Sequence, residues 1–229
     1  MGKKRIIVAL DNNNNIDQLL KLVDLLKSEV FAFKIGYEFF FNFGLDGYKL
    51  IQEQNVKIFL DLKLHDIPNT VKKGIEAISK INPFFTTIHI SGGDKMQNAA
   101  IFSKKNTKIL GVSILTSLDD QQTLKYYFNK DLNKIVSNFT TYAIENNLDG
   151  VVCSPLEVKL VKKISGDKLI IVVPGIRPKD YKDINDDQKR FIEPKEAVDF
   201  GADFLVIGRP ITKAKDPLKE TKLINKSLF

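Results

Sequence analysis

Cysteine, histidine and long apolar runs are all scarce in this sequence, and each shortage excludes a class of protein. The single cysteine, Cys153, rules out an intrachain disulfide and a cysteine metal cluster. Two histidines far apart in the chain are too few ligands for a zinc site. No stretch reaches the roughly 20 apolar residues of a membrane-spanning helix, and the apolar run of MGKKRIIVALD is too short for a secretion signal. We therefore expect a cytoplasmic protein with no membrane association.

The sequence does contain an ordinary share of core-forming residues and an excess of positive charge. Its 229 residues are 43% hydrophobic, which is enough for a sizeable core. The formal net charge is +7, but the lysines are spread along the chain and mixed with acidic residues. We therefore expect no nucleic-acid partner, and we interpret the charge as a field that attracts a phosphorylated substrate.

Short β-branched stretches alternate with longer segments of helical spacing along the whole chain. Three of the helical segments are residues 16–30, 70–81 and 132–146. The eight predicted strands are residues 5–10, 31–35, 57–63, 85–90, 107–113 with Ile114 at the edge, 150–154, 169–175 and 204–208. They are continuous apolar runs, which is typical of parallel strands that are buried on both faces.

Eight strands that alternate with helices favour a (β/α)8 barrel, also called a TIM barrel. An open doubly wound sheet is the alternative, but it usually has fewer strands and a glycine-rich turn after the first one. The first strand here runs into ALDNNNN, which has no such turn. Since no linker is visible, we predict a single (β/α)8 barrel domain over residues 1–229.

Polar residues at the C-terminal ends of the strands are the candidates for chemistry, because barrel active sites lie there. Asp61 and Lys63 are two residues apart, so a regular strand would place them on one face, near Lys34 on the adjacent strand. Asp11 ends the first strand, and Asp66 lies just beyond the third. A lone buried charge is very costly, whereas alternating lysines and aspartates compensate one another. The pattern predicts a charged array, with a purely structural ion-pair network as the alternative.

Two other interpretations of these polar residues are weaker. A magnesium site made of Asp11, Asp61 and Asp66 is conceivable, but the interleaved lysines already supply positive charge. His65 is expected to point outward or to lie in the loop, and we favour packing or a backbone hydrogen bond over a direct role in the chemistry. His89 is either a catalytic base or, as we favour, a hydrogen-bonded core histidine.

The end of the chain predicts an anion site. In VIGRPITKA, Gly208 lets the backbone approach a ligand, Arg209 offers a bidentate fork, and Pro210 suits the first turn of a helix. The long polar segment 177–190 contains no glycine, and we interpret it as a lid from which Gln188 reaches the ligand. The alternative to the anion site is an ordinary loop with a surface arginine. The alternative to the lid is a loop that has no role in binding.

Several motifs follow one another in an order that resembles a known enzyme family. They are VALD, FKIG, DLKLHDIPNTV, ISGG, LTS, PGIRP, DQKR and VIGRP, and together they span nearly the whole chain. The core Asp61-x-Lys63-x-x-Asp66 is shared with a wider group of barrels, whereas HDIPNT, PGIRP and IGRP are more specific. On these motifs the chain resembles the orotidine 5′-phosphate decarboxylases.

The resemblance implies a reaction and a set of residue roles. The reaction is the conversion of orotidine 5′-monophosphate to UMP and CO2 in de novo pyrimidine synthesis, with no cofactor and no metal. The implied catalytic residues are Lys34, Asp61, Lys63 and Asp66, with Lys63 protonating C6. The implied substrate contacts are Asp11 and Lys34 at the ribose, Thr116 by the pyrimidine, and Arg177, Gln188, Gly208 and Arg209 at the phosphate and lid. Asp66 and Thr70 would enter the site of the second subunit of a homodimer.

Two other functions stay open at this point. A magnesium-dependent hexulose-phosphate synthase shares the D-x-K-x-x-D core, but it lacks the HDIPNT continuation and this lid. A non-catalytic barrel that binds a nucleotide is the other, although a binding module has no need for a buried array of alternating charges. A requirement for magnesium would distinguish the hexulose-phosphate synthase from a decarboxylase. Binding without turnover would distinguish the non-catalytic barrel.

Overall fold

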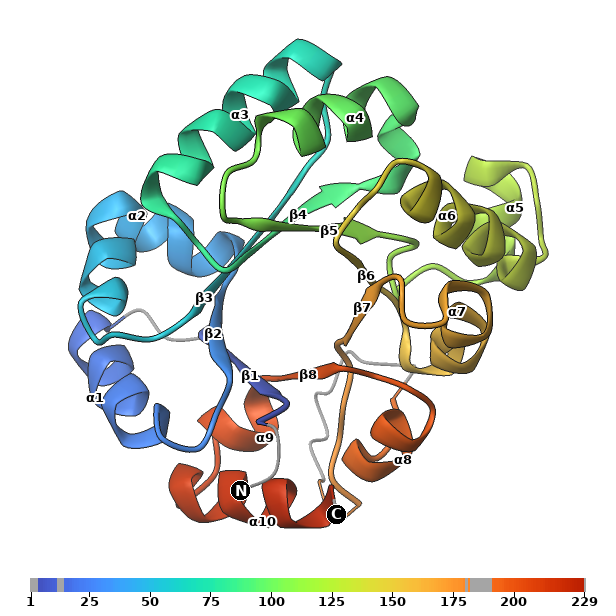
Figure 1. The fold of residues 1–229 in the computed structure, drawn as a ribbon. Helices are drawn as coiled ribbons and strands as arrows, with labels where there is room; N and C mark the ends of the chain where they lie inside the picture. The colour runs from blue at the N-terminus through green and yellow to red at the C-terminus, as the bar shows by residue number, and fades with distance from the viewer. Residues whose placement is uncertain (1–3, 12–14, 180, 182–190, 229) are drawn as a thin grey trace.

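Eight parallel strands close into a barrel in which each strand pairs with its neighbours in sequence and β8 pairs with β1 (Figure 1). The computed structural model describes residues 4–11, 15–179, 181 and 191–228. The strands are β1 (Ile6–Ala9), β2 (Ala32–Ile35), β3 (Ile58–Leu64), β4 (Phe85–His89), β5 (Lys108–Val112), β6 (Gly150–Val152), β7 (Ile170–Val173) and β8 (Phe204–Ile207). The predicted (β/α)8 architecture is confirmed.

Helices form a ring around the strands, as Figure 1 shows. They are α1 (Ile16–Leu26), α2 (Tyr37–Gln52), α3 (Pro68–Ile81), α4 (Asp94–Ser103), α5 (Asp120–Tyr127), α6 (Leu132–Glu145), α7 (Val158–Ser165), α8 (Pro194–Asp199), α9 (Arg209–Thr212) and α10 (Pro217–Ser227), with short 3-10 turns at Ile90–Gly92 and Pro155–Glu157. The first helix was predicted to reach residue 30 but ends at Leu26. Val30 continues the apolar pattern because it is buried in the turn that leads to β2, where its N–H donates to the Leu26 carbonyl.

Apolar side chains are buried in two layers, one between strands and helices and one inside the barrel. In the outer layer, Ile6 and Val8 of β1 belong to the same cluster as Leu19 and Val23 of α1. The inner layer consists of Ile7, Ala9, Ala32, Phe59, Phe85, Leu110, Val172, Phe204 and Val206. Successive residues of a strand point to opposite faces, so each strand needs apolar residues at consecutive positions. This explains the continuous apolar runs in the sequence.

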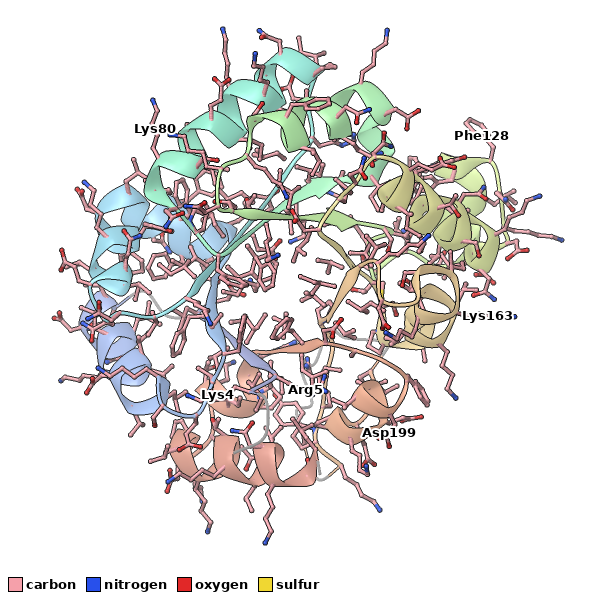
Figure 2. The ribbon with its side chains drawn as sticks, viewed as in Figure 1. Lys4, Arg5, Lys80, Phe128, Lys163 and Asp199 are labelled. Carbon is pink, nitrogen blue, oxygen red and sulfur yellow. The ribbon has the colours of Figure 1, made fainter. Side chains whose placement is uncertain are left out.

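Both charged and apolar side chains project from the outside of the ring. Figure 2 shows Lys163 of α7 and Phe128, which follows α5, pointing away from the barrel, and Phe128 is 89% exposed. Among the described helices, none is long and apolar enough to cross a membrane.

Candidate active site

The inner face of the barrel changes from apolar to polar within two residues at the C-terminal ends of four adjacent strands. Asp11 follows Ala9, Lys34 follows Ala32, Asp61 follows Phe59, and Thr87 follows Phe85. Because residues two apart lie on the same face of a regular strand, the polar side chains lie directly above the inner apolar layer. The strands of the barrel therefore bring together residues as far apart in sequence as Asp11 and Thr87, which are 76 positions apart.

Four of the predicted residues form a continuous chain of alternating charge. The Lys34 ammonium Nζ lies 2.8 Å from Asp11 Oδ2 and 3.8 Å from Asp61 Oδ2. The Lys63 Nζ donates to the same Asp61 Oδ2 at 2.9 Å. The side chain of Asp61 is only 12% exposed, whereas that of Lys63 is 26% exposed. Lys63 is therefore the charged group of this pair that a bound molecule can reach more easily.

The surroundings of Asp61 keep its carboxyl ionised. Burial acts to raise its pKa, but the positive charges of Lys34 and Lys63, with hydrogen bonds from Lys63 and Thr87, outweigh burial and hold the pKa below its ordinary value. An ionised Asp61 in turn attracts the ammonium groups of both lysines. The array is thus a set of fixed charges that exists before any substrate binds.

β3 is irregular where it carries these charges, which the spacing argument from the sequence did not anticipate. Leu60 pairs with Thr86 and Leu64 pairs with Ile88, so three residues of β3 lie opposite the single residue Thr87. Extra residues of this kind form a bulge, and bulges are frequent at barrel rims and next to active sites. Asp61 and Lys63 do lie close together as predicted, but not on a regular strand.

Side chains satisfy the backbone groups that the bulge leaves unpaired. Lys63 has a φ of 45°, a left-handed conformation that is uncommon for a residue other than glycine. Its backbone N–H donates to Thr87 Oγ1 at 2.9 Å. The Tyr37 hydroxyl donates to the carbonyl of Leu62 at 3.0 Å. Sequence reasoning missed Thr87 and Tyr37, because only the register shift reveals their role.

Gly36 is a third residue that sequence reasoning did not place in the site. A Cβ atom at this position would lie 2.8 Å from Lys34 Nζ and 2.9 Å from Asp11 Oδ1. These distances are shorter than real Cβ contacts, so any side chain at Gly36 would displace the ion pair. The FKIG motif therefore contains a glycine because the charged array needs the space.

Asp66 and Thr70 lie beyond the barrel mouth and are exposed in the single chain. Asp66 Oδ1 accepts a hydrogen bond from the Ile67 N–H at 2.6 Å. Within the described chain, no ion pair joins Asp66 to Lys34 or Lys63. The array inside one chain therefore comprises Asp11, Lys34, Asp61 and Lys63, and Asp66 is not part of it.

The loops after β7 and β8 meet, as the predicted anion site requires. Gly208 precedes the short helix α9, and Arg209 is its first residue. Arg209 lines a cavity of about 860 Å³ together with Pro178 and Tyr181 from the loop after β7. Arg177 is 7% exposed, and its guanidinium lies 5.4 Å from the centre of the Tyr181 ring. None of the charged-array residues lines this cavity, so it lies beside the array and not over it.

The other predicted positions have less defined surroundings. Thr116 lies in a turn after β5 and is partly exposed. Gln188 and most of the proposed lid, residues 180 and 182–190, fall outside the described residues. His65 is exposed, as expected, and its ring lies 5.2 Å from that of His89. Burial, with the electrostatic effects of His65 and Lys63, outweighs the opposing effect of Asp61 and holds the pKa of His89 below its ordinary value.

The carboxylates of the array do not suit a divalent cation. Asp11 and Asp61 each accept a hydrogen bond from a lysine ammonium, at 2.8 and 2.9 Å. The second oxygen of Asp61 is taken by the Thr87 hydroxyl. A magnesium ion would have to displace these groups and would then face two ammonium charges. The residues present therefore fit an arrangement in which lysines supply the positive charge.

A (β/α)8 barrel that carries a lysine–aspartate array at the C-terminal strand ends has the build of a barrel enzyme. Comparison with known proteins identifies the family. The model of the "Orotidine 5'-phosphate decarboxylase / HUMPS family" matches residues 4–224. The chain belongs to this family.

Individual relatives are similar over nearly their full length. A protein named orotidine 5′-phosphate decarboxylase from Wolbachia sp. subsp. Brugia malayi is 42% identical over 225 residues, which cover 97% of this chain and 98% of the relative. One of the same name from Vibrio parahaemolyticus is 36% identical over 233 residues, or 100% of this chain and 99% of the relative. The crystal structure of orotidine 5′-phosphate decarboxylase from Lactobacillus acidophilus is 37% identical, has a TM-score of 0.83 and covers 99% of both chains.

Proposed function

We propose that this chain decarboxylates orotidine 5′-monophosphate to UMP and CO2, the reaction of de novo pyrimidine synthesis, without a cofactor or metal. The observation that carries the proposal is the partly buried alternation Asp11–Lys34–Asp61–Lys63 at the mouth of the barrel. Family membership and the names of the full-length relatives support the same reaction. We assign the chain to the cytoplasm, in keeping with its single, buried thiol at Cys153.

In the proposed mechanism Lys63 stabilises the reacting carbon and then protonates it. Departure of CO2 breaks the bond between C6 and the carboxylate and leaves the electron pair on C6, where no adjacent group can delocalise it. A fixed ammonium stabilises this developing negative charge without having to reorganise. Lys63 Nζ then transfers a proton to C6, which gives UMP, and the neutral amine takes a proton from solvent before the next cycle.

The aspartates keep this machinery charged. Asp61 holds Lys63 at 2.9 Å and Lys34 at 3.8 Å, so that each ammonium group has a carboxylate partner at the barrel mouth. Asp11 pairs with Lys34 at 2.8 Å, and we assign these two residues to the ribose hydroxyls as well. Thr116, in the turn after β5, is assigned to the pyrimidine edge.

The phosphate of the substrate is assigned to the loops after β7 and β8. Arg177, Gly208 and Arg209 supply charge and backbone N–H groups there, and Gln188 is assigned to a lid over segment 177–190. Binding energy from a phosphate that does not react can drive closure of such a lid and assemble the site. The convergence of Arg209 with Pro178 and Tyr181 on one cavity supports this assignment.

We further propose a homodimer in which Asp66 and Thr70 enter the neighbouring site. Both residues are exposed in the single chain. Apolar side chains are exposed as well. Ile67, which follows Asp66 in the sequence, is 67% exposed and Phe41 is 80% exposed, and Phe41 stacks on Tyr37 with 6.0 Å between ring centres. Exposed apolar surface of this kind is typical of a protein interface.

Subunit exchange tests the shared site. Dimers of Asp66→Ala and dimers of Lys63→Ala are each expected to be inactive, and a mixture is expected to regain activity because one hybrid site is intact. Labelled subunits give the extent of exchange. If exchange is complete and no activity returns, Asp66 does not act across the interface.

Product analysis tests the reaction itself. Incubation with orotidine 5′-monophosphate in D2O is expected to yield UMP that carries deuterium at C6, as measured by chromatography and mass spectrometry. A parallel incubation with a hexulose phosphate and magnesium is expected to leave that sugar phosphate unchanged. Turnover of the sugar phosphate and not of the nucleotide, by folded protein, would favour the hexulose-phosphate synthase.

A further inference from the structure

Thr87 lies on the inner face of the barrel, where the charged array meets the bulge of β3. It belongs to β4, its side chain is 0% exposed, and its hydroxyl makes two hydrogen bonds. The hydroxyl donates to Asp61 Oδ1 at 2.9 Å and accepts from the Lys63 N–H at 2.9 Å. These directions are unambiguous, because an ionised carboxylate can only accept and a backbone N–H can only donate.

The first hydrogen bond divides the two oxygens of Asp61 between different partners. Oδ1 is held by Thr87, so Oδ2 is left for both ammonium groups, Lys63 at 2.9 Å and Lys34 at 3.8 Å. Without the hydroxyl, the carboxylate could rotate and offer one oxygen to each lysine. The position of the Lys63 ammonium over the barrel mouth therefore depends on Thr87.

The second hydrogen bond holds the strained backbone of Lys63. At the register shift this N–H donates to the Thr87 hydroxyl and not to a backbone carbonyl of the ladder. A buried N–H without a partner is destabilising, and a left-handed residue other than glycine persists only where its surroundings over-determine it. Thr87 supplies the missing partner and so fixes the direction in which the Lys63 side chain leaves the strand.

From these contacts we infer that Thr87 is a positioning residue of the reaction centre, which orients the Asp61 carboxylate and the Lys63 ammonium toward the reacting carbon through a single hydroxyl. The inference rests on the proposed decarboxylation. Thr87 touches neither substrate nor proton in this account; it acts through Asp61 and Lys63. A valine, which has the same shape but no hydroxyl, would leave the fold intact and misplace both charges.

The neighbouring residue Thr86 is a matched control. It is also 0% exposed and lies on the same strand, but it points to the opposite face. Its hydroxyl has no hydrogen-bond partner among the described residues. Thr86→Val therefore removes the same atoms from the same strand without disturbing the array.

The test compares steady-state kinetics of the full chain with Thr87→Val, Thr87→Ser and Thr86→Val. Thr87→Val is expected to lower kcat about 10- to 100-fold, with a change of less than about threefold in KM, because the phosphate and ribose contacts remain. Thr87→Ser keeps the hydroxyl and is expected to restore kcat to within about fivefold, and Thr86→Val to leave it within about twofold. Equal kcat in Thr87→Val and wild type would overturn the inference while leaving the decarboxylation established.

A crystal structure of Thr87→Val gives a second result that does not depend on turnover. The inference predicts that Asp61 Oδ2 and Lys63 Nζ separate from 2.9 Å to more than about 3.5 Å, beyond a hydrogen bond. If the two atoms keep their separation and the φ of Lys63 stays near 45°, Thr87 positions neither group. If wild type itself does not decarboxylate the nucleotide, the proposed function fails, and this structure still decides the role of Thr87.

Discussion

The two ends of this barrel contain different kinds of side chain, aromatic at the N-terminal end and charged at the C-terminal end. At the N-terminal end, five aromatic side chains close the interior: Phe31, Phe59, Phe84, Phe85 and Phe204. Phe31 and Phe204 have ring centres 4.2 Å apart, and Lys57 caps the cluster with its ammonium 4.5 Å from the centre of the Phe31 ring. At the C-terminal end, two residues beyond Phe59 on β3 and three beyond Phe31, which directly precedes β2, the interior contains carboxylate and ammonium groups.

The comparison indicates that one end of the sheet contributes mainly to stability and the other end mainly to chemistry. Aromatic packing gains free energy by burying apolar surface and needs no particular charge state. The charged end gains little net stability, because desolvation of buried ions opposes their attraction. We therefore expect changes at the aromatic end to affect unfolding, and changes at the charged end to affect turnover.

Lys63→Ala should produce the largest effect, a loss of activity, because it removes an ammonium group from the charged end. Loss of both the proton donor and the fixed positive charge is expected to lower kcat/KM by at least about 10^4-fold. The fold should persist, because Asp61 keeps Lys34 as a partner at 3.8 Å. Stopped-flow or long-incubation assays measure the rate, and circular dichroism with UMP binding shows that the protein is folded. Near-normal turnover would show that Lys63 is not the donor.

Phe204→Ala should produce the next largest effect, but on stability. Phe204 is 5% exposed and packs on Phe31 and Phe85, so its truncation is expected to lower the free energy of unfolding by about 3–5 kcal/mol. The kcat of the folded protein should stay within about threefold. Phe128→Ala, at an aromatic that is 89% exposed, is the control and should change stability by less than about 0.5 kcal/mol. Denaturant titrations measure both.

Arg209→Ala should have a smaller effect that is confined to phosphate binding. Removing one charge-assisted contact is expected to lower kcat/KM about 10- to 100-fold, mainly through KM. Lys213→Ala removes the same charge from the same cavity at an exposed position, so it controls for the general positive field. Equal effects of the two substitutions would mean that Arg209 contributes only to that field.

The smallest expected effect is a change in how stability depends on pH. The pKa of Asp61 in the folded protein lies below its ordinary value of 3.8, so the folded state binds fewer protons than the unfolded state in that range. The stability that Asp61 contributes is therefore fully present above pH 3.8 and is lost as the pH falls through the lower, folded value. Melting temperatures measured from pH 6 to pH 3 should fall less steeply for Asp61→Asn than for wild type. Parallel curves would contradict the lowered pKa.

The sequence was sufficient for the barrel and for most of the charged array. Continuous apolar runs and helical spacing specify strand and helix locally, and the polar residues at strand ends mark the site because closure of the barrel brings those ends together. Thr87 and Tyr37 could not be predicted, since their roles depend on a register shift between β3 and β4 that no local pattern encodes. The sequence shows that residue 36 is a glycine, but it does not show why. The space that Lys34 and Asp11 need is evident only from the folded structure.

The central claim is that fixed lysine and aspartate charges decarboxylate orotidine 5′-monophosphate without a metal. The most direct measurement is the loss of orotidine 5′-monophosphate absorbance in the presence of excess EDTA. We predict rapid conversion to UMP at a rate that added magnesium does not change. Folded protein that shows no conversion, or conversion only after magnesium is added, would contradict the account.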